Sequence, residues 1–187
     1  MKDDAQLIDE ALSGATEAFG QLVTRYQDRL YNTLVHVINS REEAYDVVQD
    51  AFVQAFLKLD TFQRTSAFYT WLYRIAFNAA ISRRRREKTS ISVEQTRELT
   101  GQEPISRGDG PGKRLEQEER ACQVQAALAT LSEEHRTVLV LRELDGCCYE
   151  TIAEVLDLPV GTVRSRLHRA RTQLRDQLKE VLQEDFQ

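Results

Sequence analysis

The sequence predicts an all-α fold, with two small helical domains joined by a flexible linker and a helix-turn-helix in the C-terminal domain. The chain of 187 residues is long enough for two such domains. It holds only three prolines and eight glycines, and most of these helix breakers cluster between Gly101 and Gly112. The rest is rich in Ala, Leu, Glu, Gln and Arg, which favour helices.

The N-terminal domain is expected to cover residues 1–86. Apolar residues recur there at close to the helical period of 3.6. Ser40 followed by Glu43 forms a capping box that starts the third helix, and a short polar loop at 60–65 precedes the fourth. The pattern predicts four helices: Asp3 to Leu12, about Thr16 to Ile38, Ser40 to Leu59, and about Ser66 to Arg85.

Residues 87–114 form a polar stretch that we interpret as an extended linker, which permits both compact and extended placements of the two domains. The segment Gly108 to Lys113 is not a phosphate loop, because its glycines are too close together and Arg114 follows the lysine. The C-terminal domain is expected at 115–187. Its predicted helices are Leu115 to Leu131, Ser132 to Asp145-Gly146, about Tyr149 to Leu156, and about Gly161 to Leu182.

The composition excludes several classes of function. The three cysteines, Cys122, Cys147 and Cys148, form no CxxC pair and have no histidine at zinc-ligand spacing, so neither a disulfide framework nor a metal site is expected. The histidines are dispersed and no nucleophile motif occurs, so we expect no enzyme and no cofactor. An acidic N-terminus and short apolar runs predict a cytoplasmic protein without membrane insertion.

Positive charge is concentrated in two patches within an acidic chain of net charge −5. Residues 62–86 hold six arginines and no acid, and residues 158–175 hold five arginines and no acid. By contrast, residues 1–60 hold five basic and eleven acidic residues. Local patches of this kind indicate phosphate-bearing partners, although solvated arginine faces on an ordinary acidic protein give the same pattern.

The C-terminal patch lies on the second helix of a predicted helix-turn-helix. At 100° per residue, one face of that helix is apolar and the other is polar. The start of the helix, Gly161-Thr162, is expected to offer free backbone N–H groups to a phosphate. An arginine-rich polar face of this kind fits a DNA major groove. The polar and flanking residues are Arg164, Ser165, Arg166, His168, Arg169 and Arg171.

The fourth helix of the N-terminal domain carries aromatic residues around its whole circumference. Phe68 and Leu72 face one way, Tyr69 and Tyr73 face another, and Trp71 lies between. Two interpretations stay open. The helix is either a central one buried on every side, or a platform on which unpaired bases stack while arginines hold phosphates.

Three segments resemble the conserved regions of extracytoplasmic-function sigma factors of bacterial RNA polymerase. They are VVQDAFVQAFLKLDTF (47–62), AFYTWLYRIAFNAA (67–80) and LRELDGCCYETIAEVLDLPVGTVRSRLHRAR (141–171). The resemblance implies a transcription initiation factor whose partners are core RNA polymerase and promoter DNA. Because family members are often held inactive by an anti-sigma protein, it adds an anti-sigma factor as a candidate partner.

The resemblance also assigns residues to each partner. The core polymerase contacts would be Asp50, Phe52, Gln54 and Leu57. The minus-ten element would be read by Phe62, Gln63, Arg64, Thr65, Ser66, Tyr69, Trp71, Arg74 and Asn78. The minus-thirty-five element would be read by Thr162, Arg164, Ser165, Arg166, His168, Arg169 and Arg171.

The chain departs from the family pattern at two places. In the family, the loop after Phe62 is expected to hold a base flipped out of the minus-ten element. Many relatives carry Arg-Gly-Asp where this chain has Gln63-Arg64-Thr65, so the resemblance does not predict which base this loop prefers. Relatives often have Ser in place of Cys148, and cysteine is a poor helix cap. Two rival classes remain: a helix-turn-helix regulator that binds an operator as a dimer, and a helical adaptor or anti-factor without DNA affinity.

Overall fold

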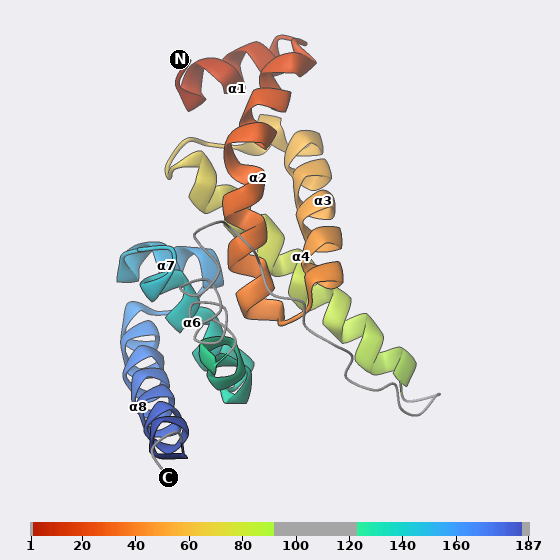
Figure 1. Cartoon of the computed structure of the whole chain (residues 1–187). Coiled ribbons are helices and arrows are strands. Elements are labelled where there is room, and N and C mark those ends of the chain that lie inside the picture. The colour runs from red at the N-terminus through yellow and green to blue at the C-terminus, as the bar shows by residue number, and fades with distance from the viewer. Residues whose placement is uncertain (1, 92–122, 185–187) are drawn as a thin grey trace, which may run out of the picture.

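The computed structural model describes residues 2–91 and 123–184, and every regular element in these ranges is helical (Figure 1). The predicted linker lies outside the described residues from position 92 onward, and the helix expected from Leu115 is described from position 123, where it is helical to 130. The other elements are α1 (Asp4–Leu12), α2 (Thr16–Ile38), α3 (Arg41–Leu57), a short 3-10 turn η1 (Leu59–Thr61), α4 (Phe68–Ile91), α6 (Glu133–Glu143), α7 (Tyr149–Leu156) and α8 (Val160–Glu184).

Local capping sets the starts of the N-terminal helices. The Asp3 side chain accepts the N–H of Gln6, and the Gln6 side chain accepts the N–H of Asp3, which makes a full capping box for α1. Ser40 accepts the N–H of Glu43 at 3.3 Å and starts α3 as expected. Asn39, at the end of α2, adopts a left-handed conformation that lets the chain turn back into α3.

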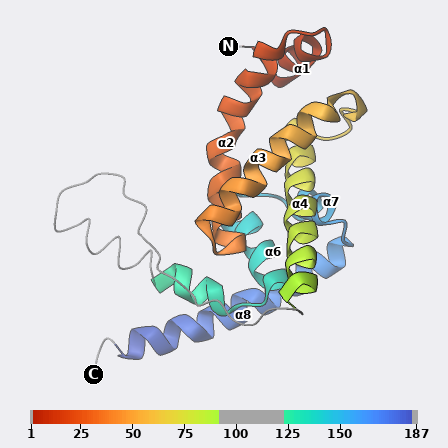
Figure 2. The ribbon, with the colours of Figure 1, turned by 90° about the vertical axis from the view of Figure 1, so that its right-hand side faces the viewer.

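Helices α2, α3 and α4 pack side by side, and α1 covers one end of α2 (Figures 1 and 2). Their core is formed by fully buried aliphatic side chains, among them Leu22, Leu34, Val47 and Leu72. Helix α4 begins at Phe68, two residues later than predicted, and continues to Ile91, because no glycine or proline interrupts the segment after Arg86.

The C-terminal helices form the predicted helix-turn-helix. Ser132 accepts the N–H of His135 and starts α6. Asp157, with a φ of 53°, ends α7 in a left-handed conformation and turns the chain toward α8. Buried Ile152 on α7 and Val163 and Leu167 on α8 hold the two helices together against α6.

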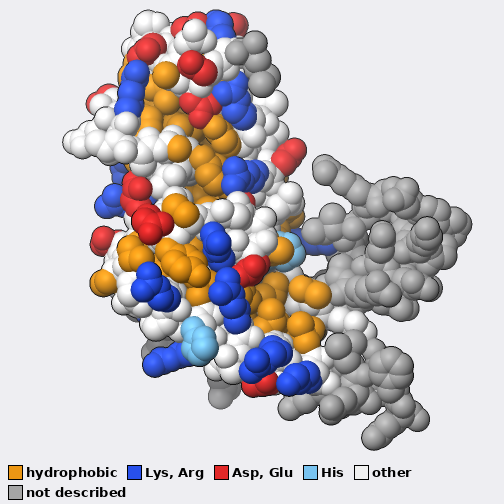
Figure 3. All heavy atoms as spheres, turned by 90° about the vertical axis from the view of Figure 1, so that its left-hand side faces the viewer, with side chains coloured by type: hydrophobic (Ala, Val, Ile, Leu, Met, Phe, Trp, Pro, Cys, Tyr) orange, Lys and Arg blue, Asp and Glu red, His pale blue; other side chains and the backbone are white. Residues whose placement is uncertain are grey.

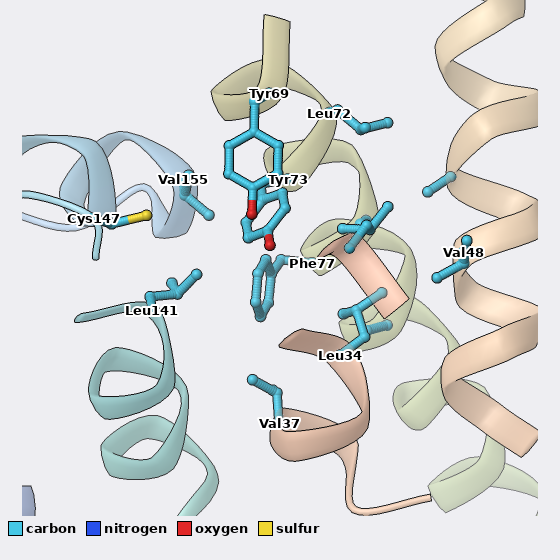
Figure 4. Packing of buried hydrophobic residues seen from close by; sticks show 14 of the residues in the cluster. Leu34, Val37, Val48, Tyr69, Leu72, Tyr73, Phe77, Leu141, Cys147 and Val155 are labelled. Atoms are coloured by element: carbon cyan, nitrogen blue, oxygen red, sulfur yellow. The ribbon is translucent and has the colours of Figure 1, made fainter. Parts of the chain in front are cut away.

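The two domains pack directly on one another in a closed arrangement. Helix α4 contacts α7, and α2 contacts α6. Between them, Tyr73 and Phe77 of α4 point toward Leu141 of α6 and Val155 of α7 (Figure 4), and all four side chains are buried in one continuous hydrophobic cluster. The structure therefore adopts the compact one of the two placements that the linker permits.

Candidate DNA and polymerase interfaces

Helix α8 separates a buried stripe from an exposed basic face. Val163, Leu167 and Ala170 are buried against α6 and α7. The residues predicted for the opposite face are exposed: Arg164, Ser165, His168 and Arg169. Lys and Arg side chains gather on this side of the molecule, around α7 and α8 (Figure 3). The face is open to a partner, as major-groove recognition requires.

The two flanking arginines of α8 are paired with carboxylates of α6. Arg171 donates from Nε and Nη2 to Oε1 of Glu143, at 3.0 and 2.6 Å. The hydrogen bond that Arg171 donates to Glu143 raises the pKa of Arg171 above its ordinary value. Arg166 lies 2.8 Å from Oε2 of Glu134. These ion pairs orient the guanidinium groups at the edges of the basic face.

The expectation of free backbone N–H groups at the start of α8 is wrong for Thr162. The backbone N–H of Thr162 is not free for a phosphate, because it donates to the carbonyl of Pro159 at 2.9 Å. The N–H of Val163 donates to the same carbonyl at 3.1 Å. The helix begins one residue earlier than predicted, at Val160, so the tight turn at Pro159 satisfies these donors internally.

The loop between η1 and α4 is anchored on α1. Phe62 is half-buried, with its ring 5.1 Å from that of Trp71, whereas Gln63, Arg64 and Thr65 are exposed and Ser66 is half-buried. Arg64 has a φ of 58° and forms an ion pair with Asp9 of α1. The hydrogen bond from Arg64 lowers the pKa of Asp9. The anchoring role of Asp9 was missed, because this contact joins residues far apart in sequence.

The residues predicted to line the strand-separation face of α4 divide into two groups. Arg74 and Asn78 are exposed and Trp71 is half-buried, so these three share an accessible side of the helix. Tyr69 is only 8% exposed and its hydroxyl donates to Asp145 at 2.8 Å, under the C-terminal domain. In this closed arrangement, the aromatic side of α4 is a buried packing surface.

Helix α3 presents an apolar strip to solvent. Leu57 is 71% exposed, Asp50 is exposed and Gln54 is half-buried, as a partner-binding surface requires. Phe52, which the resemblance also assigned to core polymerase, is 7% exposed and belongs to the hydrophobic core. Three further apolar residues of α3 that the sequence did not single out are exposed: Tyr45, Val53 and Phe56. The clue was that apolar residues occur on both sides of this helix, so they cannot all face the core.

Within the described residues, no group of three or more His, Cys, Asp or Glu side chains is arranged to hold a metal ion. In the same ranges, no helix is long and apolar enough to cross a membrane. Cys147 is buried, and burial raises its thiol pKa to about 11. Cys148 is exposed and caps α7.

Comparisons with known proteins agree with this geometry. The Sigma-70 region 2 family profile matches residues 22–89, and the Sigma-70, region 4 profile matches residues 123–174. The RNA polymerase sigma-H factor of Pseudomonas aeruginosa is 38% identical in an alignment of 188 positions, which covers 98% of this chain and 97% of that protein. The ECF RNA polymerase sigma-E factor of Escherichia coli is 36% identical over 184 residues, 96% of each chain.

Solved structures show the same fold. The sigma factor RpoE from Bartonella quintana, in complex with the anti-sigma factor NepR, superposes with a TM-score of 0.72 at 26% identity, over 86% of this chain and 96% of that one. CnrH, in complex with the cytosolic domain of CnrY, gives a TM-score of 0.67 at 30% identity, over 95% and 97%. These matches confirm the predicted sigma factor and exclude the operator-binding regulator. The chain belongs to the extracytoplasmic-function sigma factors, the RNA polymerase subunits that direct transcription initiation.

Proposed function

We propose that the C-terminal domain, residues 115–187, reads the minus-thirty-five element with α8. The observation that carries this proposal is the exposed arginine face of α8 opposite a fully buried stripe. Arg164 and Arg169 reach base edges, with Ser165 and His168 beside them, while the flanking arginines hold phosphates. Thr162 contributes through its side chain, since its N–H is already bonded to Pro159.

The N-terminal domain, residues 1–86, opens and reads the minus-ten element. The loop from Phe62 to Ser66 takes a flipped base, and the ion pair between Arg64 and Asp9 fixes the shape of that loop. Flipping a base costs a few kcal/mol, which a fitted pocket offsets. Trp71, Arg74 and Asn78 lie on the accessible side of α4, beside the loop.

Helix α3 binds the clamp helices of the largest polymerase subunit. Asp50, Gln54 and Leu57 supply polar and apolar contacts along one exposed strip, and Tyr45, Val53 and Phe56 enlarge its apolar part. Phe52 supports this surface from inside, through the core. Exposed apolar side chains in a row are typical of a protein-binding surface.

The protein acts by binding, without catalysis and without a cofactor, in the cytoplasm. Residues 87–114 connect the two domains. Polymerase holds the domains at the spacing of the two promoter elements, which raises the effective concentration of each for its element. The free chain therefore binds promoters poorly. The likeness to RpoE, solved with the anti-sigma factor NepR, supports an anti-sigma protein as a further partner.

The proposal is tested by transcription in vitro with purified core polymerase and a library of randomised promoter fragments. Selected transcripts should share two spaced elements. Arg169→Ala should lose the preference in the upstream element, by about 1–3 kcal/mol per base contact, and keep the downstream one. Arg175→Ala is the matched control, because Arg175 is exposed further along the same helix. Equal upstream preferences in the two variants would refute the role of α8, and absence of transcripts would refute initiation itself.

A further inference from the structure

A single carboxylate of the C-terminal domain is enclosed by donors of the N-terminal domain. Asp145 lies in the turn between α6 and α7, and its side chain is 5% exposed. Arg29 Nε donates to Oδ1 at 3.0 Å, and Arg29 Nη2 donates to the Asp145 carbonyl at 3.0 Å. Tyr69 donates to Oδ2 at 2.8 Å, and the Thr33 hydroxyl lies 3.1 Å from the same oxygen.

All the donors of this cluster come from α2 and α4, whereas the acidic side chain that accepts from them comes from the other domain. One guanidinium and two hydroxyl groups therefore point at one position on the surface of the N-terminal domain. Burial is the largest single influence on Arg29 and lowers its pKa, but the hydrogen bond to Asp145 and the electrostatic interactions with Tyr69, Asp145 and Tyr73 together raise the pKa above its ordinary value. The donors of α2 and α4 therefore surround a position suited to an anion, and the Asp145 carboxylate of the C-terminal domain occupies it.

We propose that Arg29, Thr33 and Tyr69 bind a backbone phosphate of single-stranded promoter DNA, and that Asp145 occupies this phosphate site in the closed arrangement. Carboxylates and phosphodiesters both present several acceptor oxygens, and a guanidinium pairs with either. Because the two anions use the same donors, they exclude one another. The inference rests on the proposed role of the N-terminal domain in opening the promoter.

The surroundings of the anion site favour a nucleic acid over an isolated anion. The guanidinium of Arg29 lies 3.9 Å from the centre of the Tyr69 ring. The Tyr69 and Tyr73 rings are 4.0 Å apart, and Phe77 continues the row at 5.9 Å from Tyr73. A row of aromatic rings beside a phosphate-binding arginine combines the two components of a single-strand binding surface.

The closed arrangement buries the aromatic row of this surface, with Tyr69, Tyr73 and Phe77 no more than 8% exposed, whereas the Arg29 side chain stays 47% exposed. Figure 4 shows Tyr69, Tyr73 and Phe77 pointing toward the C-terminal helices, with Cys147 and Val155 opposite. Single-stranded DNA reaches the aromatic row and the position of the Asp145 carboxylate only when the domains separate. The apparent affinity of the free chain is then the intrinsic affinity multiplied by the small fraction of open molecules. Asp145 thus lowers the apparent DNA affinity of the free factor further, by occupying the phosphate site.

The experiment measures fluorescence anisotropy of a labelled pool of random 12-nucleotide single strands with the full chain. Asp145→Asn removes the negative charge and keeps a polar side chain that the hydroxyl donors still reach. It should bind the pool about tenfold more tightly than the wild type. Asp28→Asn is the matched control, because it removes the same charge from α2 next to Arg29. If both variants gain the same affinity for the pool, the effect comes from the loss of one negative charge anywhere on the protein, and the proposal is overturned.

The second arm tests the phosphate contact in the Asp145→Asn background. Adding Arg29→Gln should weaken binding and reduce the slope of log affinity against log salt by about 0.7, the value for one phosphate of a single strand. Arg29→Lys should restore the slope. An unchanged slope in the Arg29→Gln variant would overturn the phosphate site.

Competition with inorganic phosphate at constant ionic strength tests whether the site prefers a phosphate of DNA or binds any free phosphate. Failure of phosphate to displace the oligonucleotide pool at millimolar concentration supports DNA, whereas full displacement makes the site a general oxyanion site and overturns the assignment. The same proteins are assayed with core polymerase on a selected promoter. A wild type that initiates while the anisotropy arms fail overturns only this inference, whereas a wild type that never initiates refutes the proposed function.

Discussion

The Cys148 thiol accepts a hydrogen bond from the backbone N–H of Thr151, with 3.4 Å between sulfur and nitrogen. Cys148 also lies 3.1 Å from the Thr151 hydroxyl. A residue type that caps helices poorly therefore occupies the capping position of α7, the first helix of the helix-turn-helix.

Replacing this thiol should change stability in a defined order. We expect Cys148→Ser to stabilise the protein and Cys148→Ala to destabilise it, with about 1 kcal/mol between the two variants, because a hydroxyl accepts the N–H of Thr151 better and a methyl group cannot accept it. Urea unfolding followed by circular dichroism measures the difference. Equal stability of the Ser and Ala variants would show that the cap contributes nothing.

Phe52 and Leu57 lie on the same helix but on opposite sides of its surface, with 7% and 71% of each residue exposed. Phe52→Ala should destabilise the fold by about 3–5 kcal/mol, because it leaves a cavity in the core. Leu57→Ala should change stability by no more than about 0.5 kcal/mol and still weaken binding to core polymerase. Unfolding curves and co-migration with core polymerase separate the two effects. A Phe52→Ala variant that is as stable as the wild type but fails to bind polymerase would show that Phe52 contacts polymerase directly.

The hydroxyl groups of Thr33 and Tyr73 lie 2.7 Å apart, and both side chains are buried. Tyr73→Phe should cost about 1 kcal/mol, because it removes the phenol from this hydrogen bond while keeping the ring in place. A double-mutant cycle with Thr33→Val isolates the pair. The coupling energy should exceed about 0.5 kcal/mol, and strictly additive effects would argue against a direct hydrogen bond.

Tyr26 should make the stability sensitive to alkaline pH. Burial, followed by its hydrogen bond to Asp4, raises the pKa of Tyr26 from 10.0 to about 12. A raised pKa means that the protonated phenol stabilises the fold. This contribution is fully present below pH 10 and is lost as the pH rises through 12.

The measurement compares the wild type with Tyr26→Phe by urea unfolding across the alkaline range. The wild type should be the more stable protein at neutral pH, and its advantage should shrink as the pH approaches 12. The pKa values of Tyr69 and Tyr73 are also raised, mainly by burial, but both proteins share those groups. A difference that stays constant up to pH 12 would contradict the role of Tyr26.

Much of the fold could be predicted from the sequence because it depends on neighbours along the chain. Ser40 and Ser132 cap the helices that follow them, as expected, since each accepts an N–H only three residues away. The stripe of Val163 and Leu167 follows from helical period alone, and it places the arginines of α8 on the opposite, exposed face. The family resemblance, carried by segments 47–62, 67–80 and 141–171, identified the sigma factor.

The parts that could not be predicted depend on residues far apart in sequence. Both Phe52 and Tyr45 are aromatic, yet only packing against α2 and α4 decides that Phe52 is buried and Tyr45 exposed. Likewise, local sequence does not indicate that Arg64 pairs with Asp9, because an ion pair over this separation exists only after α1 packs near η1.

The sequence by itself determined the helices, their caps and the basic face of α8, since backbone hydrogen bonds and side-chain periodicity act within a few residues. Only the tertiary structure decided that the aromatic side of α4 is covered and that Asp145 meets Tyr69, a contact between residues 76 positions apart. The physical reason is that the apolar circumference of α4 fits both a buried core and an exposed platform, so the choice depends on whether the C-terminal domain supplies a complementary surface.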